Sequence, residues 1–177
     1  MKLKVFGKTV LELFDHYVLK LDLDDFVYSK NELQMIKIDK QNMDQVGQAI
    51  GNTTKKWIAN DYPYVQGYCF KNSEGNQIGS CWVMFKGGNE KLYKIRNHDS
   101  FIFRLEVEES FRGRGYSKMI MTDMFRTIKE QGCRDVVLVC ARKNEKALHL
   151  YERIGMKKIG QKIFCRVLNK NIPYYEL

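Results

Sequence analysis

The stretch Arg112-Gly113-Arg114-Gly115-Tyr116-Ser117 is predicted to form a turn between an apolar segment, residues 101–107, and an amphipathic segment, residues 118–131. The apolar segment is typical of a strand, and the amphipathic one has apolar side chains at helical spacing. A strand that enters a glycine-rich turn and leaves as a helix directs free backbone N–H groups and the positive helix end at one point. With two arginines beside it, this point is predicted to bind an anion.

The composition is that of one globular domain. The chain has 177 residues, of which 44% are apolar and 12% aromatic, enough to build a single core. No apolar run approaches the roughly 20 residues that a membrane-spanning helix needs, and the first residues lack the apolar core of a secretion signal. We therefore expect a soluble, cytoplasmic protein with no membrane partner.

Charge and cysteine content narrow the possible partners. Basic residues outnumber acidic ones by 30 to 21, a formal net charge of +9 that favours an anionic partner. The basic residues are scattered, which disfavours nucleic acid, and a small polyphosphate ligand fits at least as well. The 5 cysteines and 3 histidines form no C-x-x-C or H-E-x-x-H motif, so the cysteines are interpreted as reduced thiols and no metal site is expected.

The expected domain organisation separates an N-terminal extension, residues 1–33, from a main domain, residues 34–177. The extension favours a short β-meander packed on the main domain, and a helix over residues 10–20 stays open as the alternative because the apolar positions also tolerate that period. The elements expected in the main domain, in order, are a strand over 34–38, a helix over 41–50 capped by Asp39, a helix over 53–60, strands over 65–71, 77–86, 91–96 and 101–107, a helix over 118–131, a strand over 136–140, a helix over 144–154 and a closing hairpin over 158–168 and 172–177.

Two common phosphate-binding patterns are disfavoured for the turn. A Walker loop requires G-x-x-x-x-G-K-[ST], which is absent. A dinucleotide fingerprint requires a third glycine, where this chain has Lys118, and an acidic residue after the next strand, where it has Ala141-Arg142. What remains is R-x-x-G-x-[GA] in the form Arg112, Gly115, Ser117.

A second group of residues follows the buried strand after the turn. Asn144 and Tyr151 are seven residues apart, nearly two helical turns, and so are predicted to share one helix face. With both groups in this order, the chain resembles the GNAT superfamily of acyl-CoA-dependent N-acyltransferases over residues 34–168. Ser117 replaces the more frequent Gly or Ala, and Met156 replaces the usual Phe; both changes are small.

The resemblance implies an α/β (α+β) fold, in which a mixed, mostly antiparallel central sheet has helices on both faces and a splayed central strand pair. It implies that the coenzyme A pyrophosphate binds backbone amides of residues 112–117, where Gly113 and Gly115 allow close approach. Arg114 points either to this site or to solvent.

The resemblance also implies roles along the strand and the second helix. Backbone groups of Leu105 and Val107 would pair with the pantetheine arm, and Asn144 would hydrogen-bond it. The N–H of Leu105 would polarise the thioester carbonyl, and Tyr151 would donate a proton to the departing thiolate, since a phenol with a reference pKa of about 10 is protonated at neutral pH. The alternative for Tyr151 is a core tyrosine with a satisfied hydroxyl.

This assignment does not yet include a general base. A primary amine is mostly protonated at neutral pH and must lose a proton before it attacks, and relatives often place Glu or His on the acceptor side of this strand. Counting in steps of two from Leu105 puts Phe103 and Phe101 on that side. By the same parity, Glu106 and Arg104 point to the opposite face.

Neither phenylalanine can take a proton, and both are interpreted as an acceptor wall or as core. The remaining hypotheses for the base are a water relay or a residue from elsewhere, with Asp99 and His98 as candidates. The sequence thus predicts transfer of an acetyl group from acetyl-CoA to a primary amine of a small molecule, by a monomer or homodimer without metal. The alternatives are a protein or peptide N-acetyltransferase and a non-catalytic coenzyme A-binding or scaffold module.

Overall fold

The computed structural model describes residues 2–5, 8–44, 52–60, 62–88, 93–167 and 175–176. The chain forms two compact units. The larger unit is Asp22–Val137, and the terminal unit combines Met1–Leu21 with Leu138–Leu177. Within the described residues, no helix has the length and apolar character needed to cross a membrane.

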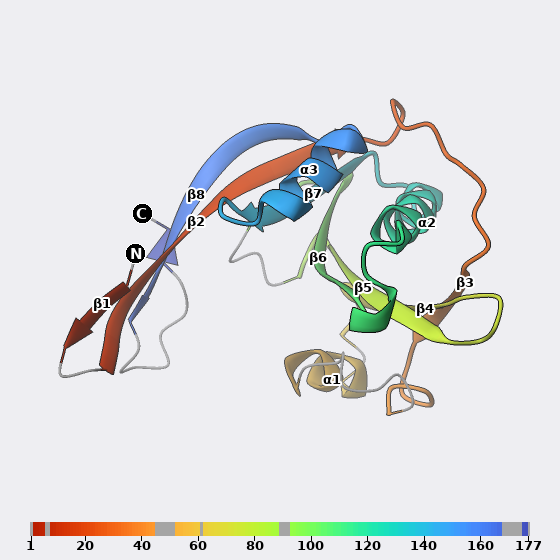
Figure 1. Cartoon of the computed structure of the whole chain (residues 1–177), viewed down its shortest axis with the longest axis horizontal. Helices are drawn as coiled ribbons and strands as arrows, with labels where there is room; N and C mark the ends of the chain where they lie inside the picture. Colours follow the sequence, from red (N-terminus) through yellow and green to blue (C-terminus); the bar gives the residue numbers. More distant parts are fainter. Residues whose placement is uncertain are drawn as a thin grey trace. The chain divides into compact units, whose positions relative to one another are not determined.

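The larger unit is built on a mixed sheet (Figure 1). Its neighbouring strands β3 to β6 pair antiparallel, whereas β6 and β7 pair in parallel. The strands, in spatial order, are β3 (Gln34–Ile38), β4 (Val65–Lys71), β5 (Gln77–Phe85), β6 (Asp99–Val107) and the first part of β7 (Asp135–Ala141). The expected mixed, mostly antiparallel sheet is therefore confirmed.

The parallel pair β6–β7 is short. Its register runs from Asp99↔Asp135 to Phe101↔Val137, although β6 continues to Val107. Beyond Phe101, the edge of β6 that faces away from β5 is not paired with β7 in this register. This agrees with the expected splay of the central pair.

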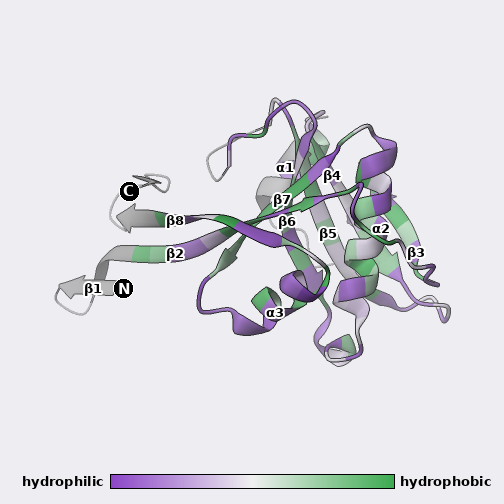
Figure 2. Ribbon diagram, turned by 90° about the horizontal axis from the view of Figure 1, so that it is seen from above, coloured by the Kyte–Doolittle hydropathy of each residue, from purple (hydrophilic) through white to green (hydrophobic). Residues whose placement is uncertain are grey.

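Helices cover both faces of the larger unit's sheet. Ile36 of β3 packs in a cluster with Ile58 of α1 (Asn52–Ala59), whereas the hydroxyl of Thr127 in α2 (Tyr116–Glu130) contacts the sulfur of Met35. Because adjacent strand residues point to opposite faces, α1 and α2 lie on opposite faces, as Figure 1 also shows. Patches of hydrophobic and hydrophilic residues alternate along α2 (Figure 2), whose buried apolar side is formed by Ile120, Met121, Met124, Phe125 and Ile128.

The terminal unit places the N-terminal residues inside a sheet. Strand β2 (Lys8–Asp22) lies between β7 and β8 (Lys157–Val167) in the strand order and pairs antiparallel with β8 from Leu11↔Val167 to Lys20↔Lys157. The helical alternative for residues 10–20 is therefore wrong. The register with β8 shifts between Val18 and Leu19, and both of these consecutive side chains are buried.

The remaining elements of the terminal unit are short. Strand β1 (Lys2–Val5) forms a hairpin with β2, helix α3 is Glu145–Arg153, and β9 (Tyr175–Glu176) pairs antiparallel with β8. The predicted closing hairpin is confirmed in its pairing. Its turn at residues 169–171 lies outside the described residues.

Two expected elements of the larger unit differ from the structure. Residues 93–96 form no strand, because the Asp99 carboxylate accepts hydrogen bonds from the Tyr93 hydroxyl (3.0 Å) and the Arg96 N–H (3.2 Å) and holds them in a loop. Asp39 caps a turn by accepting from Gln41 N (2.8 Å) and Asn42 N (3.0 Å). The rest of the helix expected over 41–50 lies outside the described residues, as do residues 91–92.

Candidate active site

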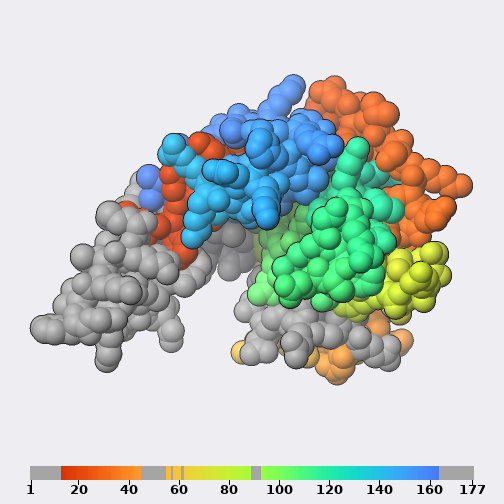
Figure 3. Space-filling model, viewed as in Figure 1, coloured from red at the N-terminus to blue at the C-terminus, as the bar shows by residue number. Residues whose placement is uncertain are grey.

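The turn after β6 has the geometry of an anion cradle. A short 3-10 helix, Glu109–Phe111, leads into it, and Gly113 and Gly115 adopt φ of 78° and 83°. Gly115 is the N-cap of α2, and its carbonyl accepts the first helical bonds, while no side chain caps the helix. A Cβ on either glycine would meet no heavy atom within 4 Å, so the space beside this backbone is open. In Figure 3 the green to teal segment with the turn and α2 reaches the visible surface.

The two arginines of the turn have different surroundings. Arg112 Nε donates to the carbonyl of Val107 at 3.0 Å and so ties the turn to the end of β6. This bond uses one of the five N–H donors of the guanidinium. The guanidinium of Arg114 lies over the Phe111 ring, 5.7 Å from its centroid, and Phe111 meets Tyr116 edge-on. Arg114 is thus an exposed cation positioned by an aromatic contact.

The end of β6 directs backbone groups away from β5. Glu108 N donates to Ile78 O at 2.8 Å, and Val107 lies opposite Gly79. In an antiparallel ladder, pairs that exchange hydrogen bonds alternate with pairs that do not, so the N–H and C=O of Val107 point away from β5. Arg112 occupies that carbonyl. The N–H of Val107 is the group that stays suited to a pantetheine contact.

A β-bulge changes the side-chain directions before this point. Trp82 of β5 lies opposite Phe103, whereas Ser80 lies opposite Glu106. One β5 residue therefore faces both Arg104 and Leu105, and Arg104 has a φ of 54°.

The bulge overturns the parity assigned to Glu106. Because Ser80 and Trp82 share a face, their opposite residues Glu106 and Phe103 share it too. The expectation that Glu106 points to the other face is wrong, because simple counting assumes one residue per ladder position. Gly79 makes the arrangement possible, since a Cβ there would overlap the carbonyl oxygen of Glu106.

The two candidate bases, Asp99 and His98, make structural contacts. Asp99 is 6% exposed and holds the Tyr93 hydroxyl and the Arg96 N–H. Burial, with the hydrogen bond to Asp99, raises the pKa of Tyr93 to about 12. His98 has a φ of 88°, and its carbonyl accepts from Arg134 N (2.8 Å) and Asp135 N (3.0 Å). These contacts give Asp99 and His98 a structural role at the start of the β6–β7 pair.

The two phenylalanines are not equivalent. Phe101 is 4% exposed and stacks between Tyr93 and Phe103, with ring centroids 6.2 and 6.4 Å apart. It is a core residue. Phe103 is half-buried and packs with Trp82 on the face that also carries Glu106. Ser80 Oγ and Trp82 Nε1 are buried on the same face without a hydrogen-bond partner among the described residues.

Helix α3 carries the second motif in the terminal unit. Asn144 is the N-cap of α3, and its side-chain oxygen accepts from Ala147 N at 3.3 Å. It therefore precedes the helix instead of lying within it, and its side-chain NH₂ stays suited to a ligand carbonyl. Tyr151 is half-buried in the last turn of α3.

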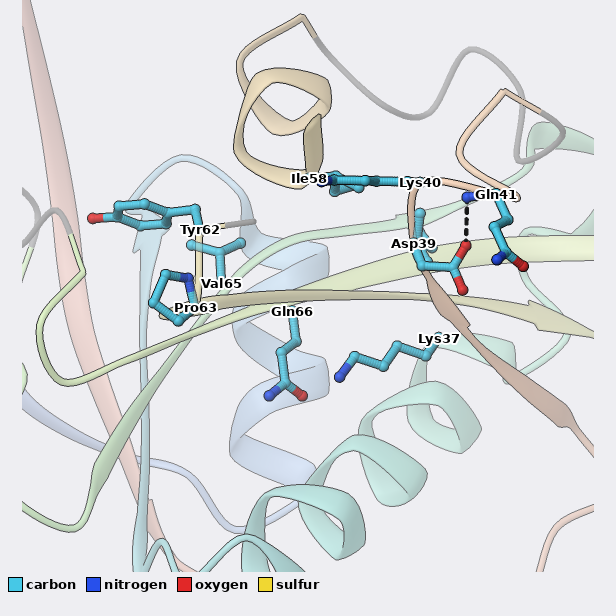
Figure 4. Close-up of a pocket in the computed structure, with 10 residues that line it drawn as sticks. Lys37, Asp39, Lys40, Gln41, Ile58, Tyr62, Pro63, Val65 and Gln66 are labelled. Carbon is cyan, nitrogen blue, oxygen red and sulfur yellow. Dashed lines mark hydrogen bonds between the residues drawn. The ribbon is translucent and has the colours of Figure 1, made fainter. Parts of the chain in front are cut away.

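A pocket of about 420 Å³ lies where β3 and β4 diverge beside α1 (Figure 4). Lys37 points toward Gln66 in this view, while Ile58 lies above them on α1. The lining residues are Lys37, Ile38, Asp39, Lys40, Gln41, Ile58, Tyr62, Pro63, Val65 and Gln66. Since it contains none of the expected site residues, we do not assign it to the acyl-transfer site.

The thiols have a structural character. Cys69, Cys81, Cys133 and Cys140 are free, and burial raises the pKa of Cys81 to about 12 and that of Cys140 to about 11. A thiol with so high a pKa is a poor nucleophile at neutral pH. Among the described residues, no group of three or more His, Cys, Asp or Glu side chains could hold a metal ion.

The sequence and the fold of this chain are similar to those of known proteins. Residues 85–165 match the family model described as FR47-like protein. The fold matches a GCN5-related N-acetyltransferase from Sphaerobacter thermophilus, with a TM-score of 0.62 at 15% identity, covering 91% of this chain and 54% of that one. The fold of this chain is therefore similar to that of GNAT acetyltransferases.

Particular relatives extend this likeness. The chain is 36% identical over 94 residues to N-acetyltransferase family 8 member 2 of Rattus norvegicus, which is 48% of this chain and 42% of the relative. A predicted acetyltransferase with acetyl-CoA from Clostridium acetobutylicum matches at a TM-score of 0.51 and 12% identity, over 71% of this chain and 90% of that one. The chain spans less than half the length of the curated relatives that it matches.

Proposed function

We propose that this chain transfers an acetyl group from acetyl-CoA to the primary amine of a small molecule. The turn at residues 112–117 carries the proposal. Two glycines at positive φ, open space beside them, an uncapped helix start and two arginines fit the pyrophosphate of coenzyme A. The GNAT-like fold, the match to the FR47-like family model and relatives named N-acetyltransferases support acyl transfer to nitrogen.

The following groups of this chain would bind acetyl-CoA, the acetyl donor. Backbone N–H groups at the start of α2, with the guanidinium groups of Arg112 and Arg114, bind the negative phosphates. The N–H of Val107 and the side-chain amide of Asn144 hydrogen-bond the pantetheine arm. The N–H of Leu105 donates to the thioester oxygen and stabilises the negative charge that grows there, an effect of about 3 kcal/mol for one such donor.

Starting from the unprotonated amine, the reaction requires two proton movements. The amine nitrogen bonds to the thioester carbon, and the carbon–sulfur bond breaks as the tetrahedral intermediate collapses. Tyr151 donates its phenolic proton to the departing sulfur and regains a proton from the acylated nitrogen. This role for Tyr151 rests on the family resemblance.

The test measures thiol release from acetyl-CoA with a panel of 2-phenylethylamine, spermidine, glucosamine and a short peptide with a free amino terminus. We expect turnover with one of the small amines and a loss of about 100-fold in kcat for Tyr151→Phe. Tyr64→Phe, at an exposed tyrosine, is the matched control and keeps full activity.

The outcomes separate the candidate functions. Turnover of the peptide alone would favour a peptide N-acetyltransferase. Coenzyme A protection against thermal unfolding without turnover of any amine would favour a non-catalytic binding module. Absence of such protection would contradict the assignment of the turn itself.

A further inference from the structure

The pocket beside α1 is lined by none of the residues that we propose for acyl transfer. Its volume of about 420 Å³ lies within the range of about 300–1,000 Å³ that is typical of sites for small ligands. The pocket lies where β3 ends and β4 begins. Because β4 and β6 are both antiparallel to β5, they run in the same direction. The start of β4 and the turn after β6 therefore lie at opposite ends of the sheet.

One wall of the pocket is apolar and anchored in the core. Ile58 of α1 and Val65 of β4 are half-buried, and both pack against the buried cluster that contains Trp82. Tyr62 and Pro63 lie next to Val65 and extend this wall (Figure 4). A wall of this kind suits a flat aromatic ring or a branched aliphatic group.

A polar segment, residues 37–42, forms another side of the pocket and is held by its own hydrogen bonds. Asp39 Oδ1 accepts from Gln41 N at 2.8 Å and from Asn42 N at 3.0 Å. The Asn42 side chain accepts from Asp39 N at 2.9 Å and donates to Lys37 O at 2.9 Å. This segment is therefore pre-organised, and a ligand would need to order little of it on binding.

The charged groups of the pocket favour an anion. Lys37 and Lys40 bring two ammonium groups to the lining, against the single carboxylate of Asp39, which already accepts two backbone N–H groups. Within the described part of the chain, the Lys37 ammonium forms no ion pair, and it points toward the Gln66 amide in Figure 4. That amide is fixed by reciprocal hydrogen bonds with Gln131, at 3.1 and 3.0 Å. An anion beside Lys37 would thus meet a cation on a rigid surface.

The same lining favours a carboxylate over a phosphate. Phosphate sites are commonly built from arginine forks or from the backbone N–H groups at a helix start. The described lining residues include no arginine and no glycine, and the apolar wall occupies the rest of the space.

We infer that this pocket is a second ligand site, which binds a small monocarboxylate with an aromatic or branched aliphatic body. The carboxylate lies on Lys37, and the body packs on Ile58 and Val65. The inference goes beyond the proposed function, because this site requires neither acetyl-CoA nor the acceptor amine.

The test is calorimetric titration of the full chain with phenylacetate and with phenylacetamide. The two probes have nearly the same shape, and only phenylacetate is charged at neutral pH. We expect saturable binding of one phenylacetate per chain and binding of phenylacetamide weaker by about tenfold or more. Lys37→Met, which keeps an unbranched side chain without the charge, should weaken phenylacetate binding by about the same factor. Lys37→Arg should retain it.

Lys71→Met is the matched control. Lys71 lies at the far end of β4, opposite Gln34 at the start of β3, and does not line the pocket. Its replacement removes the same charge and should leave the affinity for phenylacetate unchanged, as should saturating coenzyme A.

Four results would each overturn the inference and leave the proposed function intact, since thiol release is measured separately. They are the absence of saturable phenylacetate binding, equal binding of phenylacetamide, equal losses in Lys37→Met and Lys71→Met, and displacement of phenylacetate by coenzyme A or by an acceptor amine. Tighter binding of inorganic phosphate than of phenylacetate would overturn the assignment to a carboxylate.

Discussion

Replacing Gly115 by alanine tests the cradle at its centre. Gly115 caps α2 at a φ of 83°, and a Cβ there would meet no heavy atom within 4 Å. The protein therefore has room for the methyl group, and the only internal cost is the left-handed backbone. For an L-residue this conformation costs about 1–2 kcal/mol.

The effect on coenzyme A should exceed the effect on stability. A backbone N–H that loses its charged acceptor gives up about 1.5–3 kcal/mol, which corresponds to a loss of affinity of roughly 10-fold to 150-fold. The stability cost alone lowers the melting temperature by about 2–8 °C for a chain of this size. The two effects are measured by calorimetric titration with coenzyme A and by thermal unfolding of the free protein.

Gly75 offers a matched control. It lies in the hairpin loop between β4 and β5 at a φ of 81°, and a Cβ there would also meet nothing within 4 Å. Gly75→Ala should destabilise the protein as much as Gly115→Ala while it leaves coenzyme A affinity unchanged. Equal affinities of the two variants would refute the assignment of the pyrophosphate to this turn.

Two further predictions concern β6 and its neighbours. Burial and the hydrogen bond to Asp99 raise the pKa of Tyr93 to about 12 in the folded protein. Tyr93 therefore contributes to the free energy of unfolding below its ordinary pKa of about 10, and this contribution is lost as the pH rises from about 10 to 12. Urea unfolding should show a shallower fall of stability over this range in Tyr93→Phe, and an unchanged slope would contradict this. Gly79→Ala should cost about 1–3 kcal/mol by pressing on the Glu106 carbonyl, unlike Gly160→Ala, where nothing lies within 4 Å.

The turn was predictable because its signal is local. Gly113 and Gly115 take positive φ, which glycine adopts at little cost, and a helix begins directly after them. The amphipathic pattern of α2 needed no distant contact to be recognised. Neighbouring residues therefore carried the coenzyme A hypothesis.

The face of Glu106 was assigned wrongly because strand parity is not a local property. Counting in twos from Leu105 assumes a regular ladder, and the bulge adds one residue opposite β5. Arg104, which takes the positive φ, gives no warning because it is not a glycine. The supporting glycine is Gly79, on the neighbouring strand, and its importance emerges only from the pairing.

The secondary structure of the N-terminal residues also could not be predicted from the sequence alone. The apolar pattern of residues 10–20 suits a strand or a helix, and pairing with β8, at the other end of the chain, decides for the strand. Ladder hydrogen bonds come from residues distant in sequence, so periodicity alone cannot choose between the two.

The sequence by itself predicted the glycine turn, the second motif at Asn144 and Tyr151, and the resemblance to the GNAT superfamily, because these depend on residue types at short spacing. The tertiary structure decided which face Glu106 occupies and where the N-terminal strand pairs. Those features depend on register between strands, and one extra residue in a ladder reverses the direction of every side chain that follows.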